Sequence, residues 1–112
     1  MRIAHMNSNF QKFNLIDHIK LNNFSKIKDF IDSKKDLHIK DEFGNTALMW
    51  SVIFDKVEIV KLLIEAGVDI NIEDLQTWTA LDWAKYYDRK EIIEILKKIK
   101  FSTKKEKSKV II

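Results

Sequence analysis

The ten residues at positions 41–50, DEFGNTALMW, return at positions 74–83 as DLQTWTALDW, with Asp, Thr, Ala, Leu and Trp in the same places. The same interval of 33 residues separates VKLL at 60–63 from IEIL at 93–96, and it places IKDF at 27–30 one step earlier. A fixed period of this length is typical of architectures built from stacked structural repeats. We therefore divide the chain into three units, at residues 8–40, 41–73 and 74–101.

Each unit carries the pattern of two short helices followed by an extended segment. In the middle unit, apolar residues at helical spacing predict a first helix over 48–52 and a second over 57–64. Thr46 can cap the start of the first helix, as Thr79 can in the next unit. Gly67 supplies the left-handed residue that ends the second helix, and the chain then turns back as an extended finger. The chain has no proline and two glycines, which also favours helices over strands.

Two short motifs indicate which kind of structural repeat the chain contains. Residues 46–49, TALM, stand where an ankyrin repeat has T-P-L-H, and residues 67–71, GVDIN, stand where it has G-A-D-x-N. With the 33-residue period, the chain resembles an ankyrin repeat protein over residues 8–101. The resemblance implies an all-α solenoid of helix-turn-helix units with extended, β-hairpin-like fingers. In such a solenoid, units must stack because none can bury its own apolar face.

Some positions depart from the ankyrin pattern. Met49 and Asp82 replace the usual histidine, so the histidine-to-threonine hydrogen bonds of the family should be absent or altered. Asp82 also follows Thr79 by three residues, which is a capping-box arrangement. Thr77 stands at the position of Gly44, and a β-branched residue is strained where a turn needs a positive φ. We therefore expect the chain around Thr77 to bend differently from the chain around Gly44.

The first and third units carry polar residues where the middle unit is apolar. Terminal units of a solenoid need a polar outer face because no neighbour covers it. The pattern therefore predicts a complete array, with two caps around one internal unit. The differences are Asp17, Lys26 and Asp29 in place of Trp50, Ile59 and Leu62, and Lys85 and Lys97 in place of Val52 and Ile64.

The net charge of +3 resides in the C-terminal tail. Residues 102–112 contain four lysines and one glutamate, so residues 1–101 are neutral overall. A lysine-rich run of this kind is typically disordered and solvated, and we expect the same of residues 1–7. The tail also suggests an alternative function, as an adaptor that contacts nucleic acid or an anionic membrane electrostatically. The rest of the chain has no basic surplus of the kind that marks a nucleic-acid groove.

Residues suited to catalysis or metal binding do not form recognisable motifs. His5, His18 and His38 lack the spacing of a metal site, and there is no cysteine to supplement them. No glycine-rich phosphate loop and no nucleophile motif appears. We therefore expect no metal and no cofactor, and we predict that the chain is not an enzyme.

The resemblance to ankyrin repeats implies that a partner protein contacts the finger tips and the concave inner surface of the first helices. The equivalent positions here are unusually aromatic, and clustered exposed aromatic residues are typical anchors of an interface. The alternative is that these rings pack on one another and cover a thin core. The predicted partner-binding residues are Phe43, Asn45, Ile53, Phe54, Leu75, Gln76, Trp78, Tyr86 and Tyr87, with Lys20, Leu21, Lys40 and Glu42 at neighbouring positions.

Two further aromatic residues, Trp50 and Trp83, fall on the side of the first helices that faces a neighbouring unit, so helical spacing assigns them to the core. The partner is expected to be another protein of unknown identity, bound by a monomer, and nucleic acid is not expected. No apolar run approaches the roughly 20 residues of a membrane span. A cytoplasmic location is the default expectation, and delivery into another cell stays open.

Overall fold

A computed structural model of the chain describes residues 14–33 and 35–99. The segments expected at 1–7 and 102–112 lie outside the described residues. Within the described residues there is no β-strand, and an isolated bridge joins Lys40 to Thr46. The helices are α2 (Leu15–Lys20), α3 (Phe24–Asp32), α4 (Ala47–Ile53), α5 (Val57–Glu65), α6 (Ala80–Tyr86) and a last helix over residues 90–99.

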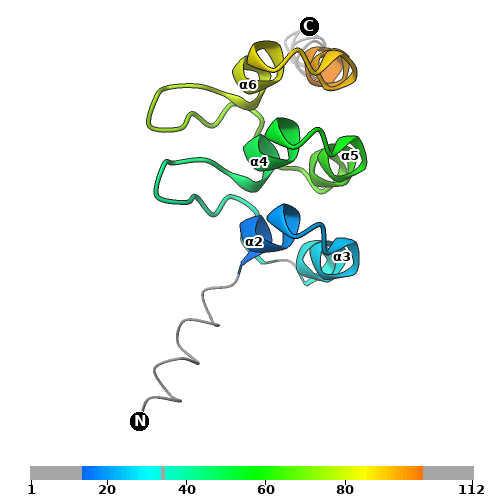
Figure 1. Cartoon of the computed structure of the whole chain (residues 1–112). Helices are drawn as coiled ribbons and strands as arrows, with labels where there is room; N and C mark the ends of the chain where they lie inside the picture. Colours follow the sequence, from blue (N-terminus) through cyan, green and yellow to red (C-terminus); the bar gives the residue numbers. More distant parts are fainter. Residues whose placement is uncertain (1–13, 34, 100–112) are drawn as a thin grey trace, which may run out of the picture.

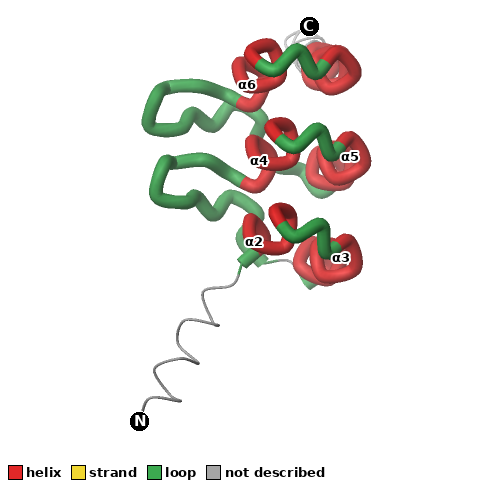
Figure 2. The backbone as a smooth tube through the Cα atoms, in the orientation of Figure 1, coloured by secondary structure: helices red, strands yellow, loops and turns green. Residues whose placement is uncertain are grey.

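The helices form two layers, and two extended loops project beside one of them (Figure 1). One layer is the stack of α2, α4 and α6, in which each helix contacts the next. The other layer holds α3, α5 and the last helix. The loops before α4 (residues 35–46, the first finger) and before α6 (residues 66–79, the second finger) run side by side (Figure 2). This arrangement confirms the predicted solenoid of helix-turn-helix units.

We call α2, α4 and α6 the inner helices. The starts of α4 and α6 follow the predicted capping pattern. The Thr46 hydroxyl accepts a hydrogen bond from the Met49 backbone N–H at 3.3 Å. At α6 the box is complete, because the Thr79 hydroxyl accepts from the Asp82 N–H at 3.3 Å and the Asp82 carboxylate accepts from the Thr79 N–H at 2.9 Å. Such caps satisfy N–H groups that have no partner within the helix. Asp82, a departure from the family pattern, therefore has a structural role.

The helix ends are closed by residues in the left-handed conformation. Gly67 has φ +89° after α5, as predicted. Asn22, Asp55 and Asp88 occupy the equivalent place after the first helix of each unit, with φ between +56° and +61°. In every case the next N–H group bonds to a carbonyl five residues back, which closes the helix end. Asn and Asp tolerate this conformation better than other non-glycine residues. This explains why the same position of each unit holds an Asn or an Asp.

A continuous apolar core runs through the stack. Leu15 and Leu48 bury their side chains from the first helices, and Ile27, Leu63 and Leu96 do so from the second. Full burial of one such side chain stabilises a fold by about 1.5–3 kcal/mol. Because the buried residues come from all three units, each unit depends on its neighbours for stability.

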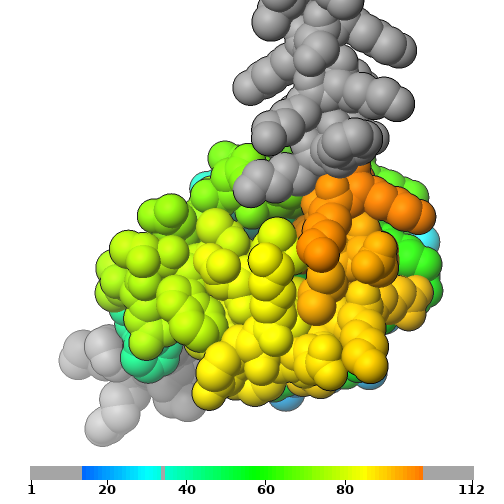
Figure 3. Space-filling model, turned by 90° about the horizontal axis from the view of Figure 1, so that it is seen from above, coloured from blue at the N-terminus to red at the C-terminus, as the bar shows by residue number. Residues whose placement is uncertain are grey.

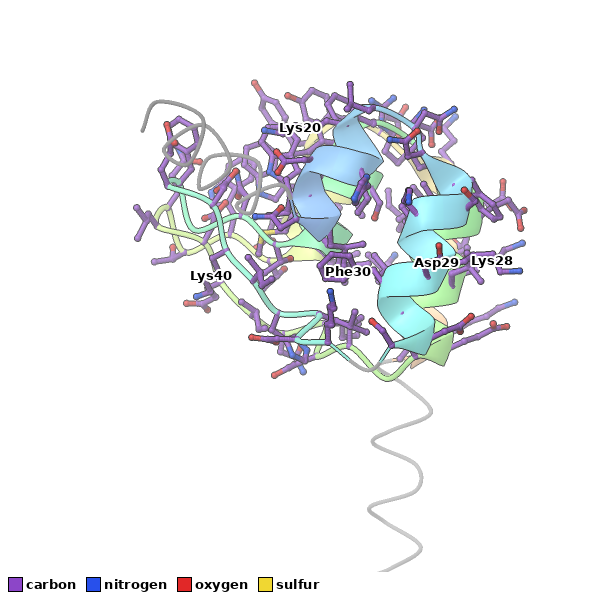
Figure 4. All side chains as sticks on the ribbon, turned by 90° about the horizontal axis from the view of Figure 1, so that it is seen from below. Lys20, Lys28, Asp29, Phe30 and Lys40 are labelled. Carbon is purple, nitrogen blue, oxygen red and sulfur yellow. The ribbon has the colours of Figure 1, made fainter. Side chains whose placement is uncertain are left out.

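The outer faces of the described stack are polar, as predicted. At the N-terminal end, Lys26 and Asp29 on α3 are exposed, and Figure 4 shows Asp29 on this face. At the other end, where α6 and the last helix lie side by side (Figure 3), Lys85 and Lys97 are exposed. The middle-unit counterpart of Lys85 is Val52, which is fully buried. Polar side chains thus stand where no neighbouring unit covers them.

The expectation that the chain bends differently around Thr77 is wrong. Thr77 has φ +65°, close to the +79° of Gly44. The same turn closes in both fingers, with the Gly44 N–H bonded to Asp41 O and the Thr77 N–H bonded to Asp74 O, each at 2.9 Å. Thr77 therefore holds a conformation that is unfavourable for a β-branched residue. The surrounding hydrogen bonds determine the turn more strongly than the preference of this one residue.

Protonation of His18, on α2, is expected to destabilise the fold. Its pKa lies below the ordinary value of 6.5, chiefly because burial desolvates the imidazolium and also because Lys26 repels it, while Asp17 acts in the opposite direction. The folded chain therefore binds this proton less readily than the unfolded chain does. The His18 contribution is complete above pH 6.5 and is lost as the pH falls through the folded pKa.

The measurement is urea unfolding of the native sequence and of His18→Gln at several pH values between about 7 and 5, the range in which histidine titrates. We expect the free energy of unfolding to fall more steeply with decreasing pH in the native sequence. Other titrating groups are common to both proteins, so the difference in slope reports His18. Parallel slopes would show that His18 has the same pKa in both states.

Candidate binding surface

The predicted binding residues fall into two groups. One group lies on the two fingers, and the other lies at the end of α4 and along α6 (Figure 1). Most members of both groups are exposed or half-buried, whereas Asn45 is buried. The finger group is Phe43, Asn45, Leu75 and Gln76. The helix group is Ile53, Phe54, Tyr86 and Tyr87, and it also includes Trp78, which lies at the end of the second finger just before α6 and packs against Tyr86.

Each finger is held in shape by one aspartate. In the first finger, Asp41 Oδ1 accepts hydrogen bonds from the backbone N–H groups of Phe43 at 3.0 Å and Asn45 at 2.9 Å. Its Oδ2 accepts from the indole Nε1–H of Trp50 on α4 at 2.7 Å. A carboxylate with several N–H donors is a strong local anchor, because charge-assisted bonds are stronger than neutral ones. Asp41 thus fixes the finger to the helix that follows it.

The second finger repeats this arrangement with Asp74. Asp74 Oδ1 accepts from the backbone N–H groups of Gln76 and Trp78, both at 2.9 Å, and Oδ2 accepts from Trp83 Nε1–H at 2.8 Å. Asp74 is 6% exposed. Neither aspartate–tryptophan pair was predicted from the sequence. The signal was the recurrence of Asp and Trp nine positions apart in both copies of the repeated decapeptide.

These bonds also refine the prediction for the two tryptophans. Trp50 and Trp83 pack against the core, as expected, but they are only half-buried. An indole N–H that leaves water needs an acceptor, and Asp41 and Asp74 supply it at the boundary between finger and helix. The rings therefore form part of the surface as well as part of the stacking layer.

The two fingers are bonded to each other at their tips. The Leu75 N–H donates to Phe43 O at 3.1 Å, and the Lys40 ammonium donates to Glu73 O at 3.4 Å. Gly44 lies where Asp74 and Leu75 pass, too close for a side chain. The side chains of Phe43 and Leu75 remain exposed beside this contact. The tips therefore present two apolar side chains at fixed positions.

Four rings pack together along α6, and we call them the α6 aromatic cluster: Trp78, Trp83, Tyr86 and Tyr87. The Trp78 centroid lies 4.6 Å from that of Trp83 and 5.4 Å from that of Tyr86. Tyr87 stacks on Trp83 at 6.0 Å with an interplanar angle of 16°, and it meets Tyr86 edge-on at 4.9 Å. Tyr86 nevertheless remains 65% exposed. The rings thus pack on one another and still offer an apolar surface.

A smaller aromatic group lies at the end of α4. Phe54, which is 40% exposed, has its ring centroid 5.4 Å from that of Trp50. The Lys20 ammonium from the end of α2 lies 4.4 Å from the Trp50 ring centroid, within the range of a cation–π contact. The ends of the first two inner helices are therefore connected through Trp50.

Arg89, which was not predicted from the sequence, connects the third unit to the second. Its Nε donates to Val52 O at 3.3 Å and its Nη2 donates to Ile53 O, so that it satisfies carbonyls at the end of α4. Its guanidinium carbon also lies 5.2 Å from the Tyr87 ring centroid. Arg89 thus fixes Tyr87 relative to the end of α4, close to two of the predicted binding residues.

The described residues contain no group of three or more His, Asp or Glu side chains that could hold a metal ion. Their helices are all too short or too polar to cross a bilayer.

Two hollows lie within the candidate surface. The finger hollow, of about 260 Å³, is lined by Phe43, Asn45, Asp74, Leu75, Gln76 and Trp83, and a second hollow of about 540 Å³ is lined by Thr77, Trp78, Asp82, Lys85 and Tyr86.

Comparison with known proteins agrees with this architecture. The family model for ankyrin repeats (3 copies) matches residues 15–106. Among solved structures, the chain is similar to EF0377, an ankyrin repeat protein, with 32% sequence identity and a TM-score of 0.69. That alignment covers 73% of this chain and 44% of the EF0377 chain, so the protein spans less than half of that relative. A comparison with curated sequences finds no match. The family match, the 33-residue register and the stacked helix-turn-helix units together show that the chain belongs to the ankyrin repeat family.

Proposed function

We propose that the chain is a non-catalytic module that binds a partner protein through the finger tips and the aromatic residues at the ends of the inner helices. Ankyrin repeats are generally protein–protein interaction modules. The observation that carries the proposal is the α6 aromatic cluster, in which Tyr86 is 65% exposed although three other rings contact it or lie beside it. Aromatic side chains are enriched at the energetic centres of interfaces.

In the proposed mechanism, the partner binds side chains and loops that folding has already fixed in position. Binding loses affinity when side chains and loops must be ordered at the interface. Here Asp41 and Asp74 already order the fingers, and Arg89 orders Tyr87. The ring contacts within the cluster restrict its side chains further. A partner therefore meets anchors whose conformational entropy has been lost during folding, and little is lost on association.

Replacing two exposed rings of the helix group, one at the end of α4 and one on α6, should abolish specific binding. We expect the variant Phe54→Ala/Tyr86→Ala to lose partner proteins that the native chain captures from native lysate. One anchor ring at an interface is worth about 2 kcal/mol, so affinity should fall at least roughly 30-fold. The measurement is quantitative mass spectrometry of the captured proteins, followed by affinity determination for each protein that the native chain enriches.

The matched control is Phe24→Ala. Phe24 is 46% exposed, close to the 40% of Phe54, but it lies at the start of α3 and outside the proposed surface. This variant should capture the same proteins as the native chain, and circular dichroism should show that all variants are folded. If Phe24→Ala and the double variant behave alike, the aromatic surface is not the binding site. A chain lacking residues 102–112 should still capture the same partner proteins. If that truncated chain captures none of them, binding through the tail is favoured instead.

A further inference from the structure

The finger hollow contains a buried polar atom that no other described residue satisfies. Asn45 is 6% exposed, and its Oδ1 has no hydrogen-bond partner among residues 14–33 and 35–99. Nearly all buried side-chain oxygens in folded proteins accept at least one hydrogen bond. The Asn45 backbone N–H is bonded to Asp41, so the residue is held in place by its main chain. Less than 1 Å² of this oxygen is exposed, so a donor that enters the hollow reaches it only when the side chains that cover it shift.

The rest of the hollow combines aromatic walls with negative charge. Phe43 and Trp83 supply rings and Leu75 supplies an aliphatic side chain, and the lining also includes Asp74, whose carboxylate accepts from the Trp83 indole. Asp74 accepts three N–H groups of the chain, whereas the two oxygens of a carboxylate offer about four acceptor sites. Asp74 thus contributes an unfilled acceptor site as well as a negative charge.

The surroundings of the hollow extend this negative charge. The adjoining stretches 40–46 and 73–78 contain four carboxylates and one ammonium, that of Lys40, for a net charge of −3. The Lys40 ammonium is directed to the backbone oxygen of Glu73 between the fingers. A surface of this sign attracts cationic groups and repels acidic ones.

We propose that the finger hollow receives an arginine side chain of the partner protein, an inference that rests on the protein-binding function proposed above. A guanidinium is planar, stacks on aromatic faces, carries a permanent positive charge and has five N–H donors. It matches the rings of Phe43 and Trp83, the charge of Asp74 and the unpaired oxygen of Asn45. An apolar side chain would leave the Asn45 oxygen without a partner, and an ammonium would not stack in the same way.

The test uses three short peptides and the ¹⁵N-labelled full chain. Acetyl-Gly-Arg-Gly-amide is compared with the same peptide carrying citrulline, which keeps the shape without the charge, or leucine, which is apolar. The indole N–H of Trp83 and the side-chain amide of Asn45 report occupancy by NMR. We expect the arginine peptide to shift both signals saturably and the citrulline peptide to bind at least roughly tenfold more weakly, a factor equivalent to the loss of one charge-assisted contact.

Two results would overturn the proposal. In one, the leucine peptide binds as tightly as the arginine peptide, which would make the hollow an apolar pocket. In the other, no peptide moves the Trp83 and Asn45 signals. Either result leaves the capture experiment on Phe54 and Tyr86 unaffected, so failure of the arginine site and failure of the proposed function can be told apart.

Substitution of Asn45 separates binding from structure. Asn45→Leu removes the unpaired oxygen and fills similar space, while its backbone N–H can still bond to Asp41. We expect unfolding in urea at an equal or higher midpoint and at least a tenfold loss of arginine-peptide affinity, because removing a buried unsatisfied acceptor does not weaken a fold. Phe24→Ala, far from the hollow, should bind the peptide normally. A lower midpoint with unchanged peptide binding would show that Asn45 is structural and would refute the assignment.

Discussion

Replacement of Asp74 by alanine is expected to lower the free energy of unfolding by about 3 kcal/mol. The substitution leaves three N–H donors without their acceptor: the backbone groups of Gln76 and Trp78 and the indole of Trp83. An orphaned buried donor costs about 1–3 kcal/mol, and bonds to a charged group are at the strong end of the range. Water can reach part of the loosened finger, so the total should fall below the sum of three full penalties. Small domains are stable by only about 5–15 kcal/mol, so this loss is large.

The measurement is urea unfolding followed by tryptophan fluorescence. Glu73→Ala removes the same charge from the adjacent exposed position and should change stability by less than about 0.5 kcal/mol. Asp74→Asn keeps one acceptor oxygen and should lie between Glu73→Ala and Asp74→Ala. Asp41→Ala removes the equivalent anchor of the first finger, where the aspartate itself is half-buried, whereas Asp74 is buried. If Asp74→Ala unfolds at the same urea concentration as Glu73→Ala, the carboxylate does not anchor the finger.

The same network explains why the decapeptide recurs along the chain. Asp anchors the finger, Thr caps the inner helix, Ala and Leu enter the core, and Trp bonds back to Asp. The repeat could therefore be recognised from sequence, because each shared letter has the same role in both copies of the decapeptide. Helix positions, caps and the polar outer faces could be predicted for the same reason. All of them depend on contacts within one unit or on the presence or absence of a neighbour.

Contacts between a loop and a helix were harder to predict. The Asp74–Trp83 bond spans nine residues, which is neither a helical nor a strand spacing, so periodicity does not reveal it. Arg89 reaches Val52 across 37 residues, and that contact depends on how two units are placed relative to each other. The aromatic positions of the candidate surface follow from the repeat register. The burial of Asn45 does not, because it depends on the second finger covering the first.

The opposite effects of two substitutions at equivalent turn positions provide the strictest test of this stacking. Gly44→Ala is expected to destabilise the fold by about 3 kcal/mol. A Cβ at Gly44 would lie 2.8 Å from Leu75 N and 3.2 Å from Asp74 Cα, so the second finger would have to move away. The φ of +79° adds about 1–2 kcal/mol for a residue with a side chain. Displacement would also weaken the hydrogen bond from Leu75 N–H to Phe43 O, worth about 1 kcal/mol.

Thr77→Gly, at the equivalent turn of the second finger, should instead stabilise the fold by about 0.5 kcal/mol. Release of a left-handed β-branched residue gains about 1–2 kcal/mol, and the greater freedom of glycine in the unfolded chain offsets about 0.4–1 kcal/mol of this. Urea unfolding of both variants should therefore show midpoints displaced in opposite directions from that of the native sequence. A glycine at Thr77 that destabilises would mean that the turn gains more from the threonine side chain than it loses in backbone strain. If Gly44→Ala is tolerated, the two fingers lie farther apart at this turn than the 2.8 Å between an added Cβ and Leu75 N implies.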